Sequence, residues 1–590
     1  MSRLSNHIVS VWQDVEAQLR RTPALRYGTV ALDKRNDSLI KDAILLWYLA
    51  GVDLLCSGDS TKFEAKRWIN NLMQCDVKEL FIVLKEADIA LTKGDIQSYD
   101  GFKRHLRTFS SHAGPILAPA KSELTRWFVN REPSTFSNLH CFFSFPSRVN
   151  ITLESLESEA LTDYLNLESQ LDETPPTTAE GELLTSWYPR TDIVARNRFR
   201  ENIKCKHGSG STSDAGKILV DKYLLLSSTV RLRALASMQG LSLLTFTDEE
   251  VAPCKLVFVP KSALGYRSIS MEPATHMWYQ QGILAAWCND LYHYQPYLKK
   301  RFDPRDQSKN RELAWEGSIN GEFSTIDLSS ASDMVRWSLV KQWFHATYLY
   351  PYLLCTRSSK VAYGDGKVIA MKKFAPMGSC LCFPIETLIF TAIVECAIKE
   401  AGGNPRNSRY VVYGDDIVVE SEYSHHVIHR LERNGFRVNH RKTFTPDNRI
   451  HFRESCGGDY LDGCDVTPVR LSRRFAGLTP DNHHPSHIEA LIQLSNDCFS
   501  RLPSVRRRCL HSLSQYNVVF DSSGERGVFS TQPTNFHLTE GYDTDTQQPY
   551  VLGGFPTNME KGQYEDFEDI RLLEYLRTVQ ERQRLMYPED

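Results

Sequence analysis

Arg409-Tyr-Val-Val-Tyr-Gly-Asp-Asp-Ile-Val-Val419 is the segment from which the architecture of this 590-residue chain can be inferred. Two runs of β-branched and aromatic residues flank a Gly-Asp-Asp triplet, a pattern that predicts a β-hairpin. An aspartate in a turn is usually only a turn former. Two adjacent carboxylates, Asp415 and Asp416, would however repel each other at the tip unless a cation lay beside them. The doubled acid between strands that are apolar enough for burial therefore indicates a divalent metal site.

A third carboxylate follows an apolar run earlier in the chain. Residues 323–326, Phe-Ser-Thr-Ile, predict a buried strand that ends at Asp327. Residues 329–333, Ser-Ser-Ala-Ser-Asp, predict the start of a helix that continues to Trp343, with the serines as candidate caps. A carboxylate at a strand end beside an Asp-Asp hairpin supplies the oxygen ligands that magnesium prefers. Two such ions, about 3.5–4 Å apart, can clamp the attacking and leaving oxygens of an in-line phosphoryl displacement.

Residues 251–311 form a basic segment that suits a polyanion. They carry nine Lys and Arg against four acidic residues, and tyrosines and tryptophans are interleaved with them. A basic surface with rings on which bases can stack suits single-stranded nucleic acid. A solvated basic face over an aromatic core explains the same pattern equally well, so the residues alone leave both interpretations open.

The composition argues against some other classes of protein. Hydrophobic residues at 41% and charged residues at 24% are typical of a folded, soluble chain, and the formal charge of −3 gives no indication of nucleic acid by itself. The longest apolar run near the N-terminus, residues 43–52, is too short to span a bilayer, and the first residues lack the apolar core of a signal peptide. The 14 cysteines include no Cys-x-x-Cys pair. We therefore expect a reduced, cytoplasmic protein without a zinc knuckle.

The carboxylates and their neighbours resemble the motifs of a known family. Asp327 and Asp333 are similar to motif A of right-hand polymerases, and Tyr413-Gly-Asp-Asp416 is similar to motif C of RNA-dependent RNA polymerases. The other motifs stand in the expected order: the basic finger motif at Lys255, Lys261 and Arg267, motif B at Met377-Gly378-Ser379, and the motif D lysine at Lys442. Several motifs in one order are far more specific than any single motif.

The chain resembles one subfamily more closely, the replicase catalytic (beta) subunit of the leviviruses, which are positive-strand RNA bacteriophages. The segments that carry this resemblance are Asp327-Leu-Ser-Ser-Ala-Ser-Asp333, Phe452-Arg-Glu-Ser-Cys-Gly457 and Asp465-Val-Thr-Pro468. The resemblance is firm over residues 251–474, thin before them and negligible after about residue 480.

Motif B departs from the pattern of this subfamily. The chain has Pro376-Met-Gly-Ser379 where the group usually carries Ser-Met-Gly-Asn. The change alters the hydroxyl and the amide that help to read the ribose, although Ser379 can still donate one hydrogen bond. Gly378 is retained and would allow the backbone to approach closely.

The resemblance implies an α+β fold, the right-hand polymerase with fingers, palm and thumb, in which an antiparallel sheet with helices forms the palm. We expect an N-terminal helical region over residues 1–110, fingers over 111–320, the palm with the catalytic core over 321–475, and the thumb with a C-terminal helical region over 476–590. Apolar residues three and four apart around residues 44–55 and 80–91 support the N-terminal assignment, and a charged helix is expected over 566–586.

The resemblance also implies a reaction, the template-directed transfer of nucleotides from NTPs to an RNA 3′ end with release of pyrophosphate. Asp327 and Asp415 would bridge two Mg²⁺ ions, for which Mn²⁺ is a possible substitute, and Asp416 would be a more peripheral ligand. Lys442 would protonate the departing pyrophosphate.

Further residues are implied to handle the nucleotide. Lys261 and Arg267 would neutralise the triphosphate, and Lys255 would hold template or phosphate. Asp333 would accept a hydrogen bond from the ribose 2′-hydroxyl, directly or through Ser379, and so favour ribonucleotides.

The partners implied by the resemblance are a single-stranded RNA template, the nascent RNA, NTPs, the host translation elongation factors Tu and Ts, and a small-subunit ribosomal protein. All would meet in the cytoplasm of the bacterial host, without a membrane. Three alternatives stay open. A reverse transcriptase shares the acidic constellation but usually has an apolar residue where Gly414 stands. A metal-dependent nuclease or NTPase could use three aspartates, and a catalytically silent RNA-binding scaffold could keep the motifs.

Overall fold

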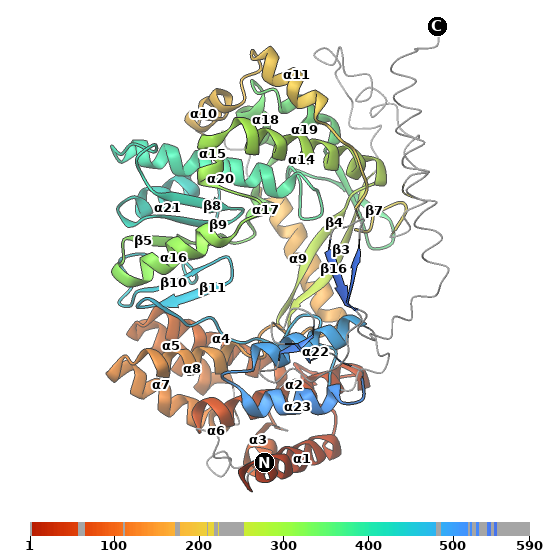
Figure 1. Ribbon diagram of the computed structural model, residues 1–590, viewed down its shortest axis with the longest axis vertical. Coiled ribbons are helices and arrows are strands. Elements are labelled where there is room, and N and C mark those ends of the chain that lie inside the picture. The colour runs from red at the N-terminus through yellow and green to blue at the C-terminus, as the bar shows by residue number, and fades with distance from the viewer. Residues whose placement is uncertain are drawn as a thin grey trace.

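The computed structural model describes residues 3–56, 65–72, 74–109, 113–171, 177–208, 210–216, 222, 253–478 and 485–516, with short pieces between 518 and 551. Figure 1 shows an elongated molecule with helices at both ends and sheets between them. Helices and mostly antiparallel sheets in one chain confirm the predicted α+β class. None of the described helices is long and apolar enough to cross a membrane.

The N-terminal part is helical, as its apolar spacing predicts. Its helices are α1 (Arg3–Arg21), α2 (Lys34–Leu55), α3 (Ala65–Leu72), α4 (Val77–Lys93), α5 (Ile96–Phe109), α6 (Ala113–Ile116), α7 (Ala118–Asn130) and α8 (Pro133–Ser144). Helix α4 illustrates how local sequence sets the bounds. Asp76 caps its first turn by accepting a hydrogen bond from the Glu79 N–H, and Gly94 ends it with a φ of 64°. The run of helices continues past residue 110.

Helices from the C-terminal part complete the same core. Helix α23 (Pro503–Leu513) packs against α2, and α22 (Pro485–Asp497) packs against α23. Asp53 of α2 accepts hydrogen bonds from the N–H and the hydroxyl of Ser504, at 2.9 and 2.6 Å, at the start of α23. Buried apolar residues from both parts form one cluster, and Figure 1 shows the two sets of helices together at one end of the molecule. The helix expected over 566–586 lies outside the described residues.

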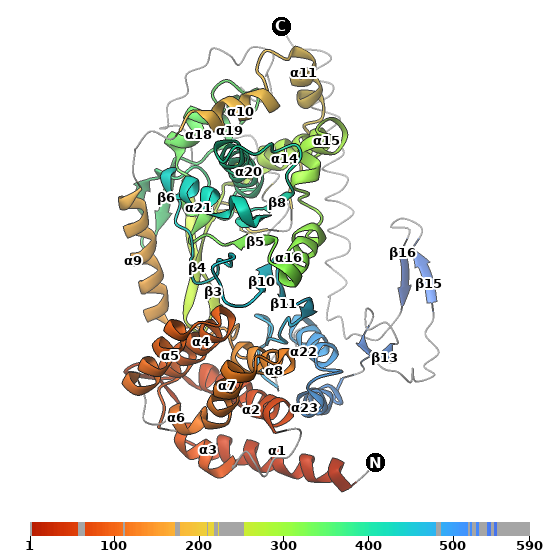
Figure 2. The ribbon, with the colours of Figure 1, turned by 90° about the vertical axis from the view of Figure 1, so that its left-hand side faces the viewer.

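Two sheets occupy the middle of the molecule. The larger has the order β4-β3-β6-β7, built from β3 (Cys254–Ser262), β4 (Gly265–Met271), β6 (Lys360–Tyr363) and β7 (Lys367–Ala370). Helix α9 (Glu154–Gln170) runs along its long β3–β4 hairpin (Figure 2). The smaller sheet has the order β5-β9-β8 and is antiparallel throughout. Its strands are β5 (Phe323–Ile326), β8 (Tyr410–Tyr413) and β9 (Asp416–Glu420).

Helices cover the smaller sheet and form a second core. Among the helices in contact with it are α16 (Ser308–Asn320), α20 (Cys382–Glu400) and α21 (Ser424–Arg433). Helix α20 is apolar nearly all round and lies within this core. The other helices of this half are α10 (Ala179–Trp187), α11 (Ile193–Glu201), α14 (Ala274–Tyr294), α15 (Pro296–Arg301), α17 (Ala331–Met334), α18 (Trp337–Phe344), α19 (Tyr350–Thr356) and the 3-10 turn η5 (Ser421–Tyr423).

Short strands complete the described structure. They are β1 (Arg26–Tyr27), β2 (Val30–Ala31), β10 (Phe452–Ser455), β11 (Gly458–Leu461), β12 (Cys464–Asp465), β13 (Phe520–Asp521), β14 (Val528–Phe529), β15 (Glu540–Asp543) and β16 (Gln548–Val551). The sheet β10-β11-β12 packs on α16, so it lies beside the smaller of the two central sheets.

The single helix predicted over 329–343 is wrong. Helix α17 ends at Met334 and α18 begins at Trp337, because the chain between them pairs with a distant segment. The Trp337 N–H donates to the Lys372 carbonyl and the Phe374 N–H donates to the Val335 carbonyl, both at 2.7 Å. The serines are not caps either, since Ser330 at the cap position has a φ of 54° and its side chain makes no capping bond. Tertiary pairing has overridden the local helical preference.

Candidate active site

The predicted β-hairpin is confirmed. Strands β8 and β9 pair with Tyr413 opposite Asp416, and Gly414 and Asp415 form the turn. Gly414 has a φ of 60°, and a Cβ at this position would lie 2.9 Å from a ring carbon of Phe383. Its N–H donates a hydrogen bond to the Thr387 hydroxyl at 3.1 Å. Both neighbours belong to α20, so this helix fixes the turn that carries the paired acids.

Strand pairing brings the third aspartate to the same edge of the sheet. The predicted strand β5 forms and pairs antiparallel with β9, with Ile326 opposite Ile417. One further residue in this register sets Asp327 opposite Asp416, at the edge where the hairpin turn carries Asp415. The structure thus brings together the three carboxylates that the sequence predicts as a group.

The pKa values of Asp327 and Asp416 are both raised. Burial raises the pKa of Asp327 to about 6, and Asp415 and Glu454 add to the shift while Lys442 opposes it. Burial also raises the pKa of Asp416 to about 7, again with contributions from the two other aspartates. A cation bound among these groups would relieve their repulsion and favour their charged forms.

The chemistry of the donors fits a hard divalent cation, which prefers carboxylate oxygens. In the part of the chain that the structure describes, no three His, Cys, Asp or Glu side chains are grouped closely enough to hold a metal as they lie. Asp327 Oδ2 accepts a hydrogen bond from Asn439 Nδ2 at 2.7 Å, and Asp416 Oδ2 accepts one from Cys456 Sγ at 3.7 Å. Each of these two carboxylates therefore has a hydrogen-bond partner at Oδ2.

The sequence did not identify Asn439 or Cys456 as a hydrogen-bond partner of these carboxylates. Both stand in segments that resemble the family, but neither residue type signals a role at its position. Asn439 also binds Asp327 through the backbone, because its N–H donates to the Asp327 carbonyl at 2.9 Å. Only the fold, which places the residues next to the carboxylates, identifies them.

Lys442 lies beside the acidic group. Its Nζ is 3.3 Å from Glu454 Oε1, and its side chain is half exposed. Glu454 and then Asp327 raise the pKa of Lys442 above its usual value and outweigh the opposite effect of burial. The ammonium is therefore charged at neutral pH.

Lys261 and Arg267 lie on the β3–β4 hairpin and face the same region. Burial lowers the pKa of Lys261, and the positive charges of Arg267, Lys442 and Arg473 lower it further, while Asp327 raises it. Arg473 was not predicted, because it lies beyond the last motif and only the fold brings it to this cluster. The arrangement gives a basic field next to the carboxylates, suited to a polyphosphate.

Lys255 is not brought to this cluster. It lies six residues before Lys261 on β3, roughly 20 Å away along an extended strand. It pairs there with Ala362 of β6. In the same basic segment Trp278 and Trp287 are buried, so these two rings belong to the core rather than to an exposed stacking surface.

Motif B touches the β3–β4 hairpin. Gly378 has a φ of 125°, and a Cβ there would lie 2.1 Å from the Ser270 carbonyl oxygen, so only glycine fits. The Ser270 N–H donates to the Met377 carbonyl at 2.8 Å. Ser379 points to α14, where its hydroxyl donates to Gln280 Oε1 at 3.1 Å.

Asp333 does not contact Ser379. It contacts Lys373, whose Nζ lies 3.0 Å from Asp333 Oδ1.

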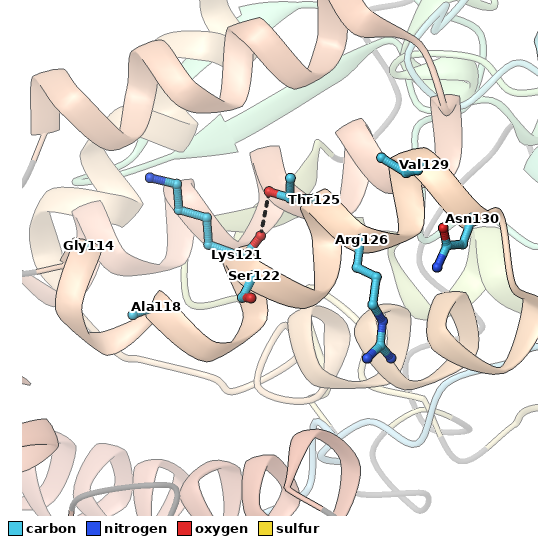
Figure 3. Close-up of a pocket in the computed structure, with 8 residues that line it drawn as sticks. All are labelled: Gly114, Ala118, Lys121, Ser122, Thr125, Arg126, Val129 and Asn130. Carbon is cyan, nitrogen blue, oxygen red and sulfur yellow. Dashed lines mark hydrogen bonds between the residues drawn. The ribbon is translucent and has the colours of Figure 1, made fainter.

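A surface groove of about 690 Å³ lies elsewhere, along α6 and α7 (Figure 3). Its lining consists of Gly114, Ala118, Lys121, Ser122, Thr125, Arg126, Val129 and Asn130. None of these is a predicted site residue. The groove is therefore separate from the carboxylate cluster.

Comparison with known proteins relates the chain to one group. Residues 227–480 match the family model described as RNA replicase, beta-chain. The chain is 32% identical over 278 residues to the RNA-directed RNA polymerase subunit beta of Qbeta virus (strain MX1), covering 46% of this chain and 45% of that protein. It is 37% identical over 223 residues to the RNA-directed RNA polymerase beta chain of Escherichia phage MS2, covering 36% and 37%. The matches thus span less than half the length of these curated relatives.

Among solved structures, the RNA-dependent RNA polymerase of BmCPV at elongation state is similar with a TM-score of 0.49 and 11% identity, covering 82% of this chain and 49% of that one. A similarity of this strength supports no inference about function.

Proposed function

We propose that the chain belongs to the RNA replicase beta-chain family, whose model matches residues 227–480, and that the protein is an RNA-dependent RNA polymerase that replicates a viral RNA genome. It would transfer nucleotides from NTPs to an RNA 3′ end, directed by a template, and release pyrophosphate. The observation that carries the proposal is the meeting of Asp327, Asp415 and Asp416 at one edge of the β5-β9-β8 sheet. The basic residues beside them supply the complementary charge for a triphosphate.

Asp327 and Asp415 would hold two divalent ions, which we propose to be Mg²⁺ with Mn²⁺ as a possible substitute, and Asp416 would be a peripheral ligand. When bound, such ions supply positive charge that activates a 3′-hydroxyl and screens the phosphates. The raised pKa values of Asp327 and Asp416 support this assignment, because three unscreened carboxylates at one edge are unfavourable.

Basic residues would handle the triphosphate and its product. Lys261 and Arg267 would neutralise the phosphates, with Arg473 adding to the field. Lys442 would hold a proton at Nζ, kept there by Glu454, and donate it to the departing pyrophosphate. Lys255, at the far end of β3, would contact template or phosphate outside the centre.

The ribose of the incoming nucleotide would be recognised at the start of α17. Asp333 would accept a hydrogen bond from the 2′-hydroxyl, and Gly378 would let the nucleotide approach the backbone. The Ser379 hydroxyl donates to Gln280, and we assign Ser379 a part in shaping motif B together with a hydrogen bond to the nucleotide.

The domain division and the partners are proposals of the same kind. We propose an N-terminal helical region over 1–110, fingers over 111–320, the palm over 321–475, and the thumb with a C-terminal helical region over 476–590. Helix α23 of the last region packs on α2 of the first. We also propose a single-stranded RNA template, nascent RNA and NTPs as substrates, and the elongation factors Tu and Ts and a small-subunit ribosomal protein as host partners in the bacterial cytoplasm.

The test is incorporation of labelled NTPs on a single-stranded RNA template with magnesium, with and without elongation factors Tu and Ts. Template-dependent RNA product is the expected result. Product formed only from dNTPs would identify a reverse transcriptase-like enzyme. Pyrophosphate or phosphate release without template would identify an NTPase, and shortening of the labelled template would identify a nuclease. RNA binding without synthesis, even with both factors present, would favour a silent scaffold.

Asp333→Ala is expected to reduce the preference for ribonucleotides. The variant loses the acceptor for the 2′-hydroxyl. Loss of one such hydrogen bond should lower the ratio of kcat/KM for an NTP to kcat/KM for the matching dNTP by roughly tenfold. The ratio is measured by single-nucleotide incorporation on one template. The alternative is that Asp333 only stabilises the start of α17. An unchanged ratio in a folded variant would support this helix-stabilising role and exclude a role in sugar selection.

Thr387→Val is expected to lower turnover roughly tenfold by releasing the turn that carries Asp415. The Gly414 N–H loses its acceptor in a buried place, which costs about 1–3 kcal/mol. The matched control is Thr391→Val, because that hydroxyl donates only to the Thr387 carbonyl, at 2.7 Å within the same helix. Equal losses of turnover in the two variants would argue against the anchoring role.

A further inference from the structure

A buried lysine holds the residue to which sugar recognition is assigned. Lys373 Nζ lies 3.0 Å from Asp333 Oδ1 and 3.3 Å from Glu168 Oε2 of α9. The side chain of Lys373 is 0% exposed, whereas that of Asp333 is 17% exposed. The ammonium also lies 3.7 Å from the centre of the Tyr164 ring. A charge so deeply buried is tolerated only when it is paired, so Lys373 and its carboxylates form one unit.

Backbone contacts fix this unit in place. The pairing of residues 335–337 with residues 372–374 joins the end of α17, which carries Asp333, to the segment that carries Lys373. The Lys372 N–H donates to Glu168 Oε1. Arg357 Nη2 donates to the Lys373 carbonyl at 3.0 Å. These main-chain hydrogen bonds therefore hold the segment that carries Lys373 beside the end of α17, which carries Asp333.

The contact engages one oxygen of the Asp333 carboxylate. Oδ1 accepts the hydrogen bond from Lys373, and no residue in the described part of the chain bonds to Oδ2. Ser379, the motif B residue in the place of the usual asparagine, does not contact Asp333 but donates to Gln280. The partner that orients Asp333 in this chain is therefore Lys373.

We propose that Lys373 is a positioning residue for sugar selection, which holds Asp333 so that Oδ2 is presented to the 2′-hydroxyl of the incoming nucleotide. This inference rests on the proposed polymerase function. One fixed ion pair removes the rotational freedom of the carboxylate and keeps it an acceptor. Loss of the lysine weakens a contact that only a ribonucleotide makes, and it leaves binding of the base and the triphosphate unchanged.

The experiment compares Lys373→Met with the full-length wild-type chain under conditions in which the latter makes RNA. The ratio of kcat/KM for ATP to that for dATP, measured on one RNA template, is expected to fall roughly tenfold, the factor that corresponds to one hydrogen bond. The fall should come from a higher KM for ATP, with dATP incorporation within about twofold of wild type. Because an ion pair supports the fold here, the thermal unfolding midpoint of each variant is measured as well.

Lys372→Met is the matched control. It makes the same change one residue away at an exposed side chain, whose Nζ contacts only the Leu171 carbonyl at 3.4 Å, and its nucleotide ratio should equal that of wild type. If Lys373→Met does not fold, Lys373→Leu, which also removes both the N–H donor and the charge, decides the question. A ratio within about twofold of wild type in a folded Lys373 variant overturns the proposal. Absence of RNA synthesis by the wild-type chain would instead overturn the polymerase function.

Discussion

Asp415→Asn is expected to lower template-dependent RNA synthesis more than about 100-fold. Loss of a residue that only supports a metal ligand typically costs 10–100-fold, and Asp415 is proposed as a direct ligand of both ions. The neutral amide also removes one of the charges that raise the pKa of Asp327 and Asp416. The measurement is the initial rate of labelled NTP incorporation at saturating magnesium, together with RNA binding, which should be unchanged.

Asp365→Asn provides the matched control, because Asp365 is also an exposed aspartate in a hairpin turn, between β6 and β7. Its rate should equal that of wild type. If Asp415→Asn kept synthesis within about tenfold of wild type, the assignment of this residue as a metal ligand would be wrong.

His140→Ala is expected to cause the largest loss of stability among the changes considered. His140 of α8 is buried between two carboxylates, with Nδ1 2.6 Å from Asp88 Oδ1 of α4 and Nε2 3.0 Å from Asp459 Oδ2 of β11. Arg470 completes the group with a contact of 2.9 Å to the same Asp459 oxygen. Removing the imidazole leaves two carboxylates without this partner, which costs about 3–5 kcal/mol in the free energy of unfolding. The network joins the N-terminal helices to the sheet that carries Glu454.

The loss of stability caused by His140→Ala should become smaller as the pH rises. Burial lowers the pKa of His140, but Asp88 and Asp459 outweigh it and raise the pKa to about 9, above the unfolded value of about 6.5. The stabilisation of the folded state by charged His140 is therefore fully present below about pH 6.5 and is lost as the pH rises through about 9. The corresponding change in the free energy of unfolding is about 3 kcal/mol. The difference in urea midpoint between wild type and variant should accordingly shrink between pH 6 and pH 10.

An exposed histidine pair serves as control for this prediction. His425 lies 3.2 Å from Asp447, but the two side chains are 64% and 70% exposed. His425→Ala should change the free energy of unfolding by less than about 0.5 kcal/mol. A destabilisation by His140→Ala that did not vary between pH 6 and pH 10 would contradict a charged imidazole in the folded protein.

Local patterns predicted much of the catalytic half. The apolar runs on either side of Gly414 predicted β8 and β9, and the run before Asp327 predicted β5, because strand preference and a turn residue act over a few neighbouring positions. The same short-range reasoning failed after Asp327. There the predicted helix is broken at Val335, since residues 335–337 pair with residues 372–374.

The sequence by itself determined which carboxylates could act together, through their residue types and the strands that carry them. Only the tertiary structure decided what surrounds them. Lys373 meets Asp333 across 40 positions, Asn439 meets Asp327 across 112, and His140 meets Asp459 across 319. No periodicity in the chain encodes such contacts, because each depends on strand register and on the packing of whole helices. A lysine, an asparagine and a histidine with no distinctive neighbours thus acquire their roles from the fold, where burial makes an unpaired polar group costly.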